Sequence, residues 1–287
     1  MAAICASNWG DGVGITKIQA AVVTDFSDKF AGKNIKTFKE LTNFVNLKME
    51  YNETSFIGSS IEYIDLSNIT KVGTLGNYYS YVFYNCTQLG SVVFSDSLES
   101  IGSLTFNNCS KFNSKLPTSI KYLGSLALAN TAYSYDVNLP NLIDVTSDKT
   151  NIPNEITGWL MDGWFGYTQI ERVTNLGSIT RISRNKDNFC MGCFEGCPNL
   201  KYVTLPATLQ TIGCRTFSGD SALIYIKCLA ITPPTIQSSL WLDGTNSSFK
   251  IYVPDDSVDA YKVASYWSTY ASRIFSLTQF AMDFPNG

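Results

Sequence analysis

Polar and apolar positions follow a short phrase that recurs along the chain. A small polar residue is followed by an aliphatic residue, then by two positions of any residue type, then by a second aliphatic residue and usually by glycine. The phrase stands at 68–73, 97–102, 119–124 and 208–213, and serine replaces the glycine at 178–183. A pattern that returns at intervals is typical of repeat proteins, in which each repeat buries its apolar side chains against its neighbours.

A second phrase begins with phenylalanine and places a cysteine three residues later. It occurs at 83–89, 106–112 and 194–200. In 217–223 Asp220 takes the cysteine place, and in 164–170 Trp164 and Tyr167 take the phenylalanine and cysteine places. The two phrases together make one repeating unit.

The interval between equivalent residues is nearly constant. It is 23 residues from Phe83 to Phe106, 22 from Phe106 to Leu128 and 23 from Phe194 to Phe217. This lies within the roughly 20–29 residues of a leucine-rich repeat. Stacked repeats place like side chains in columns, Phe upon Phe, and the strand hydrogen bonds run between coils. The strand-like alternation that follows the phrases stands at 61–66, 89–94, 170–173, 200–206 and 223–228.

The unit FEGCPNLKYVTLPATLQTIGCRTF, residues 194–217, resembles the BspA-like (Treponema-type) leucine-rich repeats of bacterial surface proteins. ITPPT followed by KIYVPDDSVDAYKVASYWSTYASRIF resembles the closing segment of such proteins from gut Bacteroidetes. The resemblance implies a leucine-rich repeat solenoid, mainly β with short helical caps, built as a right-handed stack of about six to seven coils. It also implies an extracellular or cell-surface location and binding of host or neighbouring-cell macromolecules.

We expect three segments along the chain. Residues 1–55 are predicted to form an N-terminal cap, 56–239 the repeats and 240–287 a C-terminal cap, because the end coils of a stack must be covered. Between 128 and 165 the repeat phrases are lost, and one coil is stretched there. Insertions are expected near 74–81, 146–163 and 184–193.

Both caps are expected to contain short helices. In the N-terminal cap, 14–26 and 35–47 have apolar residues at helical spacing. In the C-terminal cap, the residues at 255–257, Asp-Asp-Ser, are typical of a helix start. The side chains expected to cover the last coil are those of Trp267, Tyr270 and Ile274.

Eight cysteines raise the question of a metal or redox site. Cys86, Cys109 and Cys197 occupy the repeated cysteine place, where a small buried group satisfies backbone at a turn. Cys190 and Cys193 form a C-x-x-C pair at the end of an insertion, and the sequence offers no second pair at zinc-site spacing. Structural thiols are therefore favoured, with a cysteine-based metal-binding or redox module as the alternative function.

A glycine-rich segment, residues 8–20, resembles an acidic calcium loop followed by a helix. A working loop needs several oxygen ligands and a closing glutamate. Only Asn8 and Asp11 can serve as donors here, and Gln19 stands where the glutamate would be. We expect a vestigial loop, and no metal or other cofactor is predicted.

Composition narrows the classes of function. Apolar residues make up 45% and charged residues 16%, enough apolar sequence for a large core. A net charge of −3 argues against nucleic acid, and no apolar run reaches the 18 residues of a membrane span. The absence of histidine excludes a Ser–His–Asp or Cys–His arrangement. The first residues lack the basic start and apolar run of a secretory signal peptide.

We therefore predict a non-enzymatic binding or adhesion protein whose partner is a protein or a glycan. Aromatic side chains in the insertions are candidates because such residues anchor ligands. The candidate binding residues are Tyr78, Tyr79, Tyr81 and Trp159. The third possibility, a glycan-acting enzyme, rests on carboxylate pairs such as Asp255 and Asp256, which stand at a helix start where carboxylates are favoured anyway.

Overall fold

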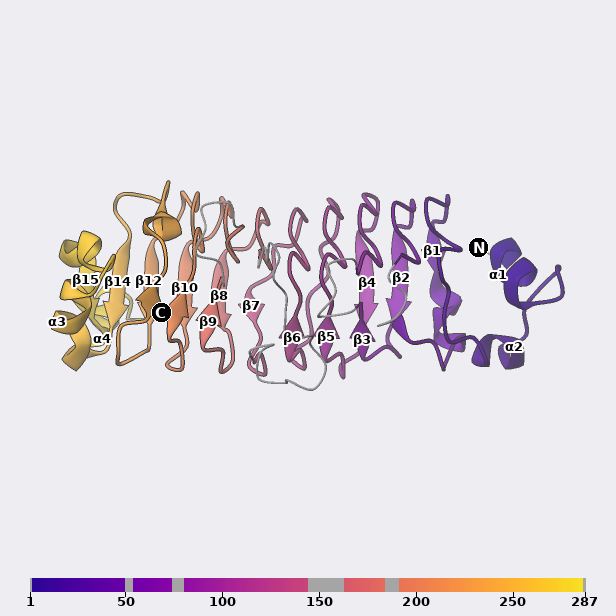
Figure 1. Cartoon of the computed structure of the whole chain (residues 1–287), viewed down its shortest axis with the longest axis horizontal. Helices are drawn as coiled ribbons and strands as arrows, with labels where there is room; N and C mark the ends of the chain where they lie inside the picture. Colours follow the sequence, from indigo (N-terminus) through magenta and orange to yellow (C-terminus); the bar gives the residue numbers. More distant parts are fainter. Residues whose placement is uncertain (1, 50–53, 74–79, 144–162, 184–190, 286–287) are drawn as a thin grey trace. The chain divides into compact units, whose positions relative to one another are not determined.

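The computed structural model describes residues 2–49, 54–73, 80–143, 163–183 and 191–285. These residues form two units, one ending at Tyr133 and the other beginning at Ser134, and each is built from short strands, turns and few helices (Figure 1). In these ranges no helix is long and apolar enough to cross a membrane. Much of the three expected insertions lies outside them.

Two three-stranded parallel sheets run through the first unit, in the orders β1-β2-β4 and β3-β5-β6. The strands are β1 (Thr37–Phe38), β2 (Tyr63–Leu66), β3 (Lys71–Val72), β4 (Ser91–Phe94), β5 (Ser100–Ile101) and β6 (Tyr122–Leu123). The helices of this unit are α1 (Ala2–Trp9), α2 (Lys17–Ala21) and the 3-10 helix η1 (Lys39–Asn43).

The second unit contains a six-stranded parallel sheet, β15-β14-β12-β10-β8-β7, and a three-stranded one, β13-β11-β9. The strands are β7 (Val137–Asn138), β8 (Arg172–Asn175), β9 (Arg181–Ile182), β10 (Tyr202–Leu205), β11 (Thr211–Ile212), β12 (Tyr225–Cys228), β13 (Thr235–Ile236), β14 (Lys250–Val253) and β15 (Ile274–Ser276). The helices are η4 (Ser239–Leu242), η5 (Asp255–Ser257), α3 (Val258–Val263), η6 (Ser268–Arg273) and α4 (Leu277–Asp283).

Strand pairing joins equivalent residues of successive coils, as the repeat pattern predicts. Ile64 pairs with Val92 in the first unit, and Val203 pairs with Ile226 in the second. All four side chains are buried, whereas the residues on either side of them point the other way along each strand. This alternation fixes the register, because a slip by one residue would turn the apolar set outward.

The phenylalanines of successive coils stack into columns. In the first unit Phe83 and Phe106 lie nearly parallel with ring centroids 5.2 Å apart. In the second unit Phe194 lies between Phe165 and Phe217 at 5.8 and 5.6 Å, again with nearly parallel rings. All five rings are buried. The predicted stacking of like side chains is therefore present in each unit.

The repeated cysteines hold each coil to the preceding one. The Cys86 thiol donates to the Phe56 carbonyl at 2.9 Å, and the Cys109 thiol donates to the Phe83 carbonyl at the same distance. In the second unit the Cys197 thiol donates to a phenylalanine carbonyl at 3.1 Å. A small donor at this place satisfies a buried backbone acceptor, which is the role that the sequence indicated.

The predicted frame of residues 164–170 is wrong by one position. Phe165, not Trp164, enters the phenylalanine column. Thr168, not Tyr167, takes the cysteine place: its hydroxyl donates to the Phe165 carbonyl at 2.7 Å and lies 3.5 Å from the Cys197 sulfur. Tyr167 has a positive φ of 57° and is 45% exposed. It occupies the left-handed turn position that Asn, Asp or Gly usually takes, so an aromatic residue concealed the frame.

The two helices predicted at 14–26 and 35–47 are shorter than expected, and α1 precedes them without having been predicted. Within 14–26 only α2 is helical, and a capping box between Thr16 and Gln19 begins it. Within 35–47 the chain forms β1 followed by η1. Thr37 and Phe38 pair with Tyr63 and Ile64, and this pairing to the next coil outweighs the helical spacing of the apolar residues.

Trp267 packs as the sequence suggested, whereas Ile274 belongs to strand β15 of the sheet instead of covering the last coil. The Trp267 indole N–H donates to the Pro234 carbonyl at 2.8 Å, and its ring lies 4.9 Å from that of Trp241. The Tyr261 hydroxyl of α3 donates to the Ala230 carbonyl at 2.7 Å. Beyond these contacts, β14 and β15 continue the large sheet and α4 follows. None of these three elements was predicted.

Candidate binding surface on the second unit

Four strands of the second unit present one line of outward side chains. Backbone pairing aligns Arg172 of β8 with Tyr202 of β10, Tyr225 of β12 and Lys250 of β14. The residue that follows each of them is aliphatic and buried, so alternation turns the line away from the core. We call these four residues the outward row. Across neighbouring strands it runs cation, ring, ring, cation.

A second line lies two residues further along the same strands. Pairing aligns Thr204 of β10 with Lys227 of β12, Tyr252 of β14 and Phe275 of β15. The outward face of the large sheet thus combines aromatic rings with the positive charges of Arg172, Lys227 and Lys250.

Rings and cations on this face hold one another in place. The Arg172 guanidinium carbon lies 4.3 Å from the centroid of the Tyr202 ring, and the Tyr202 and Tyr225 rings are 5.1 Å apart. Lys250 Nζ lies 5.2 Å from the centroid of the Phe275 ring. Burial raises the pKa of the Tyr225 phenol, so this group stays neutral at neutral pH. Each cation–π contact contributes about 0.5–1 kcal/mol at exposed sites.

Helix α4 lies over one half of this face and brings two phenyl rings onto it. Phe280 is buried, with its centroid 5.0 Å from that of Tyr225 and 5.1 Å from that of Tyr252. Lys227 Nζ lies 4.5 Å from the Phe280 ring. Phe284 adds a contact of 4.9 Å with Tyr225. The helix therefore covers the β12–β14 half of the outward face.

A carboxylate accompanies the two phenyl rings. Asp283 Oδ2 accepts hydrogen bonds from Lys250 Nζ at 2.6 Å and from the Tyr252 hydroxyl at 2.5 Å, and Gln279 donates to its other oxygen at 2.8 Å. These three hydrogen bonds lower the pKa of Asp283 to about 2. The carboxylate is therefore ionised over the whole neutral range, and it forms an ion pair with Lys250.

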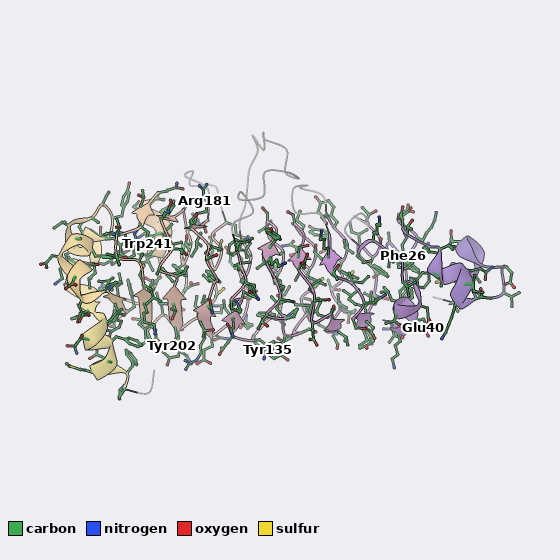
Figure 2. All side chains as sticks on the ribbon, turned by 90° about the horizontal axis from the view of Figure 1, so that it is seen from below. Phe26, Glu40, Tyr135, Arg181, Tyr202 and Trp241 are labelled. Atoms are coloured by element: carbon green, nitrogen blue, oxygen red, sulfur yellow. The ribbon has the colours of Figure 1, made fainter. Side chains whose placement is uncertain are left out.

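The other half of the face, around β8 and β10, is partly exposed and is called the open half here, although Tyr202 packs against the cluster of Tyr225, Tyr252 and Phe280. Arg172 and Tyr202 are partly exposed. Tyr135, which precedes β7, is 40% exposed and lies with Tyr202 along one side of the second unit, whereas Arg181 lies along the opposite side (Figure 2). A guanidinium binds carboxylates through paired hydrogen bonds, and an aromatic ring stacks on aromatic or sugar faces. The open half therefore offers a guanidinium for a carboxylate and an aromatic ring for an aromatic or sugar face.

The sequence did not identify this surface, although it contained a signal for it. Tyrosine or a cation stands immediately before the buried aliphatic residue in four strand segments, so the outward position is chemically alike in each. Of the residues that were predicted to bind, Tyr81 is half-buried and its ring lies 5.0 Å from that of Tyr84. Tyr78, Tyr79 and Trp159 lie outside the described residues, and their role remains a prediction.

The thiols are placed for packing. Cys193 is buried at the start of a coil, and Cys190 lies outside the described residues. Burial raises the pKa of the Cys86 thiol to about 11 and also raises that of Cys197, so both thiols are protonated at neutral pH. Within the described part of the chain, no group of three or more Cys, Asp or Glu side chains is placed to hold a metal ion.

The glycine-rich segment near the N-terminus uses its polar groups internally. Asp11 Oδ1 accepts the backbone N–H groups of Val13 and Gly14 at 2.9 and 2.8 Å, and these bonds lower the pKa of Asp11. Gln19 Oε1 accepts the Thr16 N–H at 2.8 Å within the capping box. The residue that stands in the place of a calcium-binding glutamate therefore caps a helix.

A small cavity in the first unit is a weaker candidate. Its volume is about 180 Å³, below the roughly 300–1,000 Å³ of typical ligand pockets. The lining is mostly apolar. Its side chains belong to Ala2, Cys5, Ile15, Thr16, Lys17, Ala20, Phe38, Glu40, Asn43 and Phe44.

Comparison with known proteins places the outward row within recognised repeats. The family model for the BspA type leucine rich repeat region matches six copies, within residues 25–135, 162–240 and 187–258. A leucine-rich repeat protein from Bacteroides ovatus ATCC 8483, known from a crystal structure, is 16% identical to this chain. That match covers 89% of this chain and 82% of the other, with a TM-score of 0.28. No curated protein matches.

Proposed function

Because this chain belongs to the BspA-type leucine-rich repeat family, we propose that it is a non-enzymatic binding or adhesion protein that recognises a protein or glycan through the outward face of its second unit. Repeats of this kind are scaffolds for binding, and the family is typically non-enzymatic. The observation that carries the proposal is the outward row, in which Arg172, Tyr202, Tyr225 and Lys250 face away from the core.

The composition of this face supports binding. Tyr225 and Tyr252 are buried beneath α4, whereas Arg172 and Tyr202 remain partly exposed, where small polar residues would suffice for folding. Arginine and tyrosine are instead the residues enriched at binding surfaces and among their energetically dominant contacts. Arg172 and Tyr202 also stack on each other, so little conformational freedom remains to be lost when a ligand binds.

The aromatic insertions are proposed to contribute further contacts, with Tyr78, Tyr79, Tyr81 and Trp159 as their candidate residues. We also propose an extracellular or cell-surface location, which matches a partner such as a matrix protein or a glycan of a neighbouring cell. The net charge of −3 favours neither nucleic acid nor an anionic membrane as the partner.

Binding arrays test the proposal. The native chain is applied to arrays of extracellular-matrix proteins and of glycans, beside Arg172→Ala and Tyr202→Ala variants. Arg181→Ala is the matched control, because Arg181 is exposed on β9 and lies on the opposite side of the unit. We expect the native chain and the control to give the same signals and the two row variants to lose them while still folded, with a small fall in melting temperature from the lost ring contacts. Equal binding by all four proteins would remove the outward face as the site.

The insertions are tested separately. Truncation of Tyr78 and Tyr79 to alanine is expected to weaken capture on the arrays without lowering the melting temperature. A large fall in the melting temperature would instead place these side chains in the core.

A further inference from the structure

We infer that the open half of the outward row docks an acidic, aromatic peptide segment of a partner protein, in the way that α4 docks on the other half. This inference rests on the proposed function, since it names the partner chemistry of the same face. It follows from the order of groups in the row, which has an aromatic ring followed by a cation on each side of its centre.

Helix α4 shows what the face binds. Phe280 and Asp283 are spaced i and i+3, so they share one side of α4, and Phe284 follows directly as its C-cap residue with non-helical φ and ψ. The phenyl rings lie on Tyr225, and the carboxylate takes hydrogen bonds from Lys250. One ring of the row thus receives an aromatic side chain while the neighbouring cation receives a carboxylate.

The open half contains the same pair of groups in the same register. Tyr202 is aligned with Tyr225 on the adjacent strand, and their rings are 5.1 Å apart. Arg172 stands beyond Tyr202 as Lys250 stands beyond Tyr225. The row is therefore a ring–cation pair on each side of its midpoint, with one pair covered by α4 and the other partly exposed.

The open pair favours a carboxylate more strongly than the covered pair does. Arginine presents two parallel N–H donors to a carboxylate, whereas lysine acts as a point charge. The neighbouring outward residues of β8 and β10, Thr174 and Thr204, are short; Thr174 is exposed and Thr204 is partly exposed. A segment with the pattern Phe-x-x-Asp-Phe that ends a short helix supplies a ring and a carboxylate as α4 and its C-cap residue do, so it is the expected partner of Tyr202 and Arg172.

The occupant is identified by the chemistry of α4, so the probe is its sequence. A fluorescein-labelled peptide with the sequence of residues 276–285, SLTQFAMDFP, is titrated with the full-length chain and followed by fluorescence anisotropy. A second peptide replaces both phenylalanines by alanine and the aspartate by asparagine. We expect saturable binding of the first peptide and at least tenfold weaker binding of the second.

Variants of the full-length chain locate the peptide. Arg172→Ala and Tyr202→Ala are each expected to weaken the peptide at least tenfold, Arg172→Lys is expected to weaken it less, and Arg181→Ala is expected to leave it unchanged. Melting temperatures confirm that the variants are folded. Salt is expected to weaken the native complex and to have less effect on the residual binding of Arg172→Ala.

Three results would overturn the inference. The peptide does not bind, or its affinity is unaffected by Arg172→Ala and Tyr202→Ala, or it is lost only in Lys250→Ala, which would mean that it displaces α4 and takes the covered half. The proposed function fails differently, through array binding that does not depend on Arg172 and Tyr202. If array ligands require these residues and the peptide does not bind, the face recognises another chemistry, and only the inference is lost.

Discussion

Replacing Asp220 by asparagine is expected to stabilise the protein, because a carboxyl group occupies a buried place that other coils give to a thiol. Cys86, Cys109 and Cys197 each donate there to a phenylalanine carbonyl. Asp220 is 0% exposed; its Oδ1 accepts the Cys197 N–H at 2.8 Å, and its Oδ2 has no hydrogen-bond partner among the described residues. Asparagine keeps an oxygen that accepts the Cys197 N–H. Its amide N–H group replaces the unpartnered oxygen by a donor, as the thiols of the other coils are donors at this place.

The magnitude follows from the orphaned oxygen. A buried polar group without a partner costs about 1–3 kcal/mol, and an ionised one costs more. We expect Asp220→Asn to raise the free energy of unfolding by about 2 kcal/mol at pH 7, equivalent to about 4–8 °C in melting temperature for a unit of this size.

The effect has a defined pH dependence. Burial raises the pKa of Asp220 well above its value in the unfolded chain, which is about 3.9. A raised native pKa means that the carboxyl is best accommodated when neutral, below pH 3.9, and that stability is lost as the pH rises toward the native pKa. The advantage of asparagine is therefore smallest near pH 4 and increases toward neutral pH.

Chemical denaturation at pH 4, 5.5 and 7 measures this dependence on the native chain and on Asp220→Asn. Asp243→Asn is the control, because Asp243 is an exposed carboxylate near the next coil. If Asp220→Asn destabilised the protein, or if its effect did not change with pH, the prediction would be wrong. The Asp220 carboxyl would then be stabilised by a partner other than the neighbouring coils.

Further predictions concern the core, the thiols and α4. Phe194→Ala is expected to lower the free energy of unfolding by about 3–5 kcal/mol in a denaturant titration, because the ring is buried between two others; a loss below 1 kcal/mol would contradict the column. Ellman's reagent is expected to leave at least seven of the eight cysteines unreacted until the chain unfolds, since the seven described ones are buried. Asp283→Asn is expected to speed hydrogen exchange in α4 at pH 7. In the native chain the contact of Asp283 with Lys250 weakens as the pH falls from about 4 toward 2. A carboxylate with a lowered pKa contributes stability only while it is ionised, and this contribution is lost as the pH falls through its pKa.

The fold was predictable where the sequence repeats itself. Phe83 and Phe106 are 23 residues apart, as are Phe194 and Phe217, because a column forms only if each coil places its ring at the same height. The frame around Phe165 was missed because an aromatic residue stands at a left-handed turn position and imitates the apolar phrase. Residue spacing therefore predicts the side-chain columns well, but it does not predict a coil in which one residue departs from the pattern.

Elements outside the repeats depended on tertiary pairing. Residues 35–47 have helical spacing, yet Thr37 and Phe38 join β2 because the next coil offers a free strand edge. Helix α4 was not predicted, although Ser276 caps it and accepts the N–H of Gln279 at 3.1 Å. Such a cap is visible in sequence but common, and only packing decides whether a helix follows it.

The candidate site was predictable only in part. Alternation indicates that Tyr202 and Tyr225 face outward, but it does not show that Arg172 and Lys250 complete the same line, because that requires the register between coils. Nor does it show which half α4 covers. The sequence pointed instead to aromatic residues in the insertions, which are conspicuous because they interrupt the pattern, and their role stays a prediction.

Site-specific photo-crosslinking tests most directly where the partner binds. Benzoylphenylalanine is placed at Thr204, an outward residue of β10 beside Tyr202, and in a second protein at Thr211, an outward residue of β11 in the other sheet of the same unit. The probe is the matrix protein or glycan that gives the strongest array signal. We predict a crosslinked product from position 204 and none from position 211. Capture from position 211 alone, or equally from both positions, would contradict binding on the outward face.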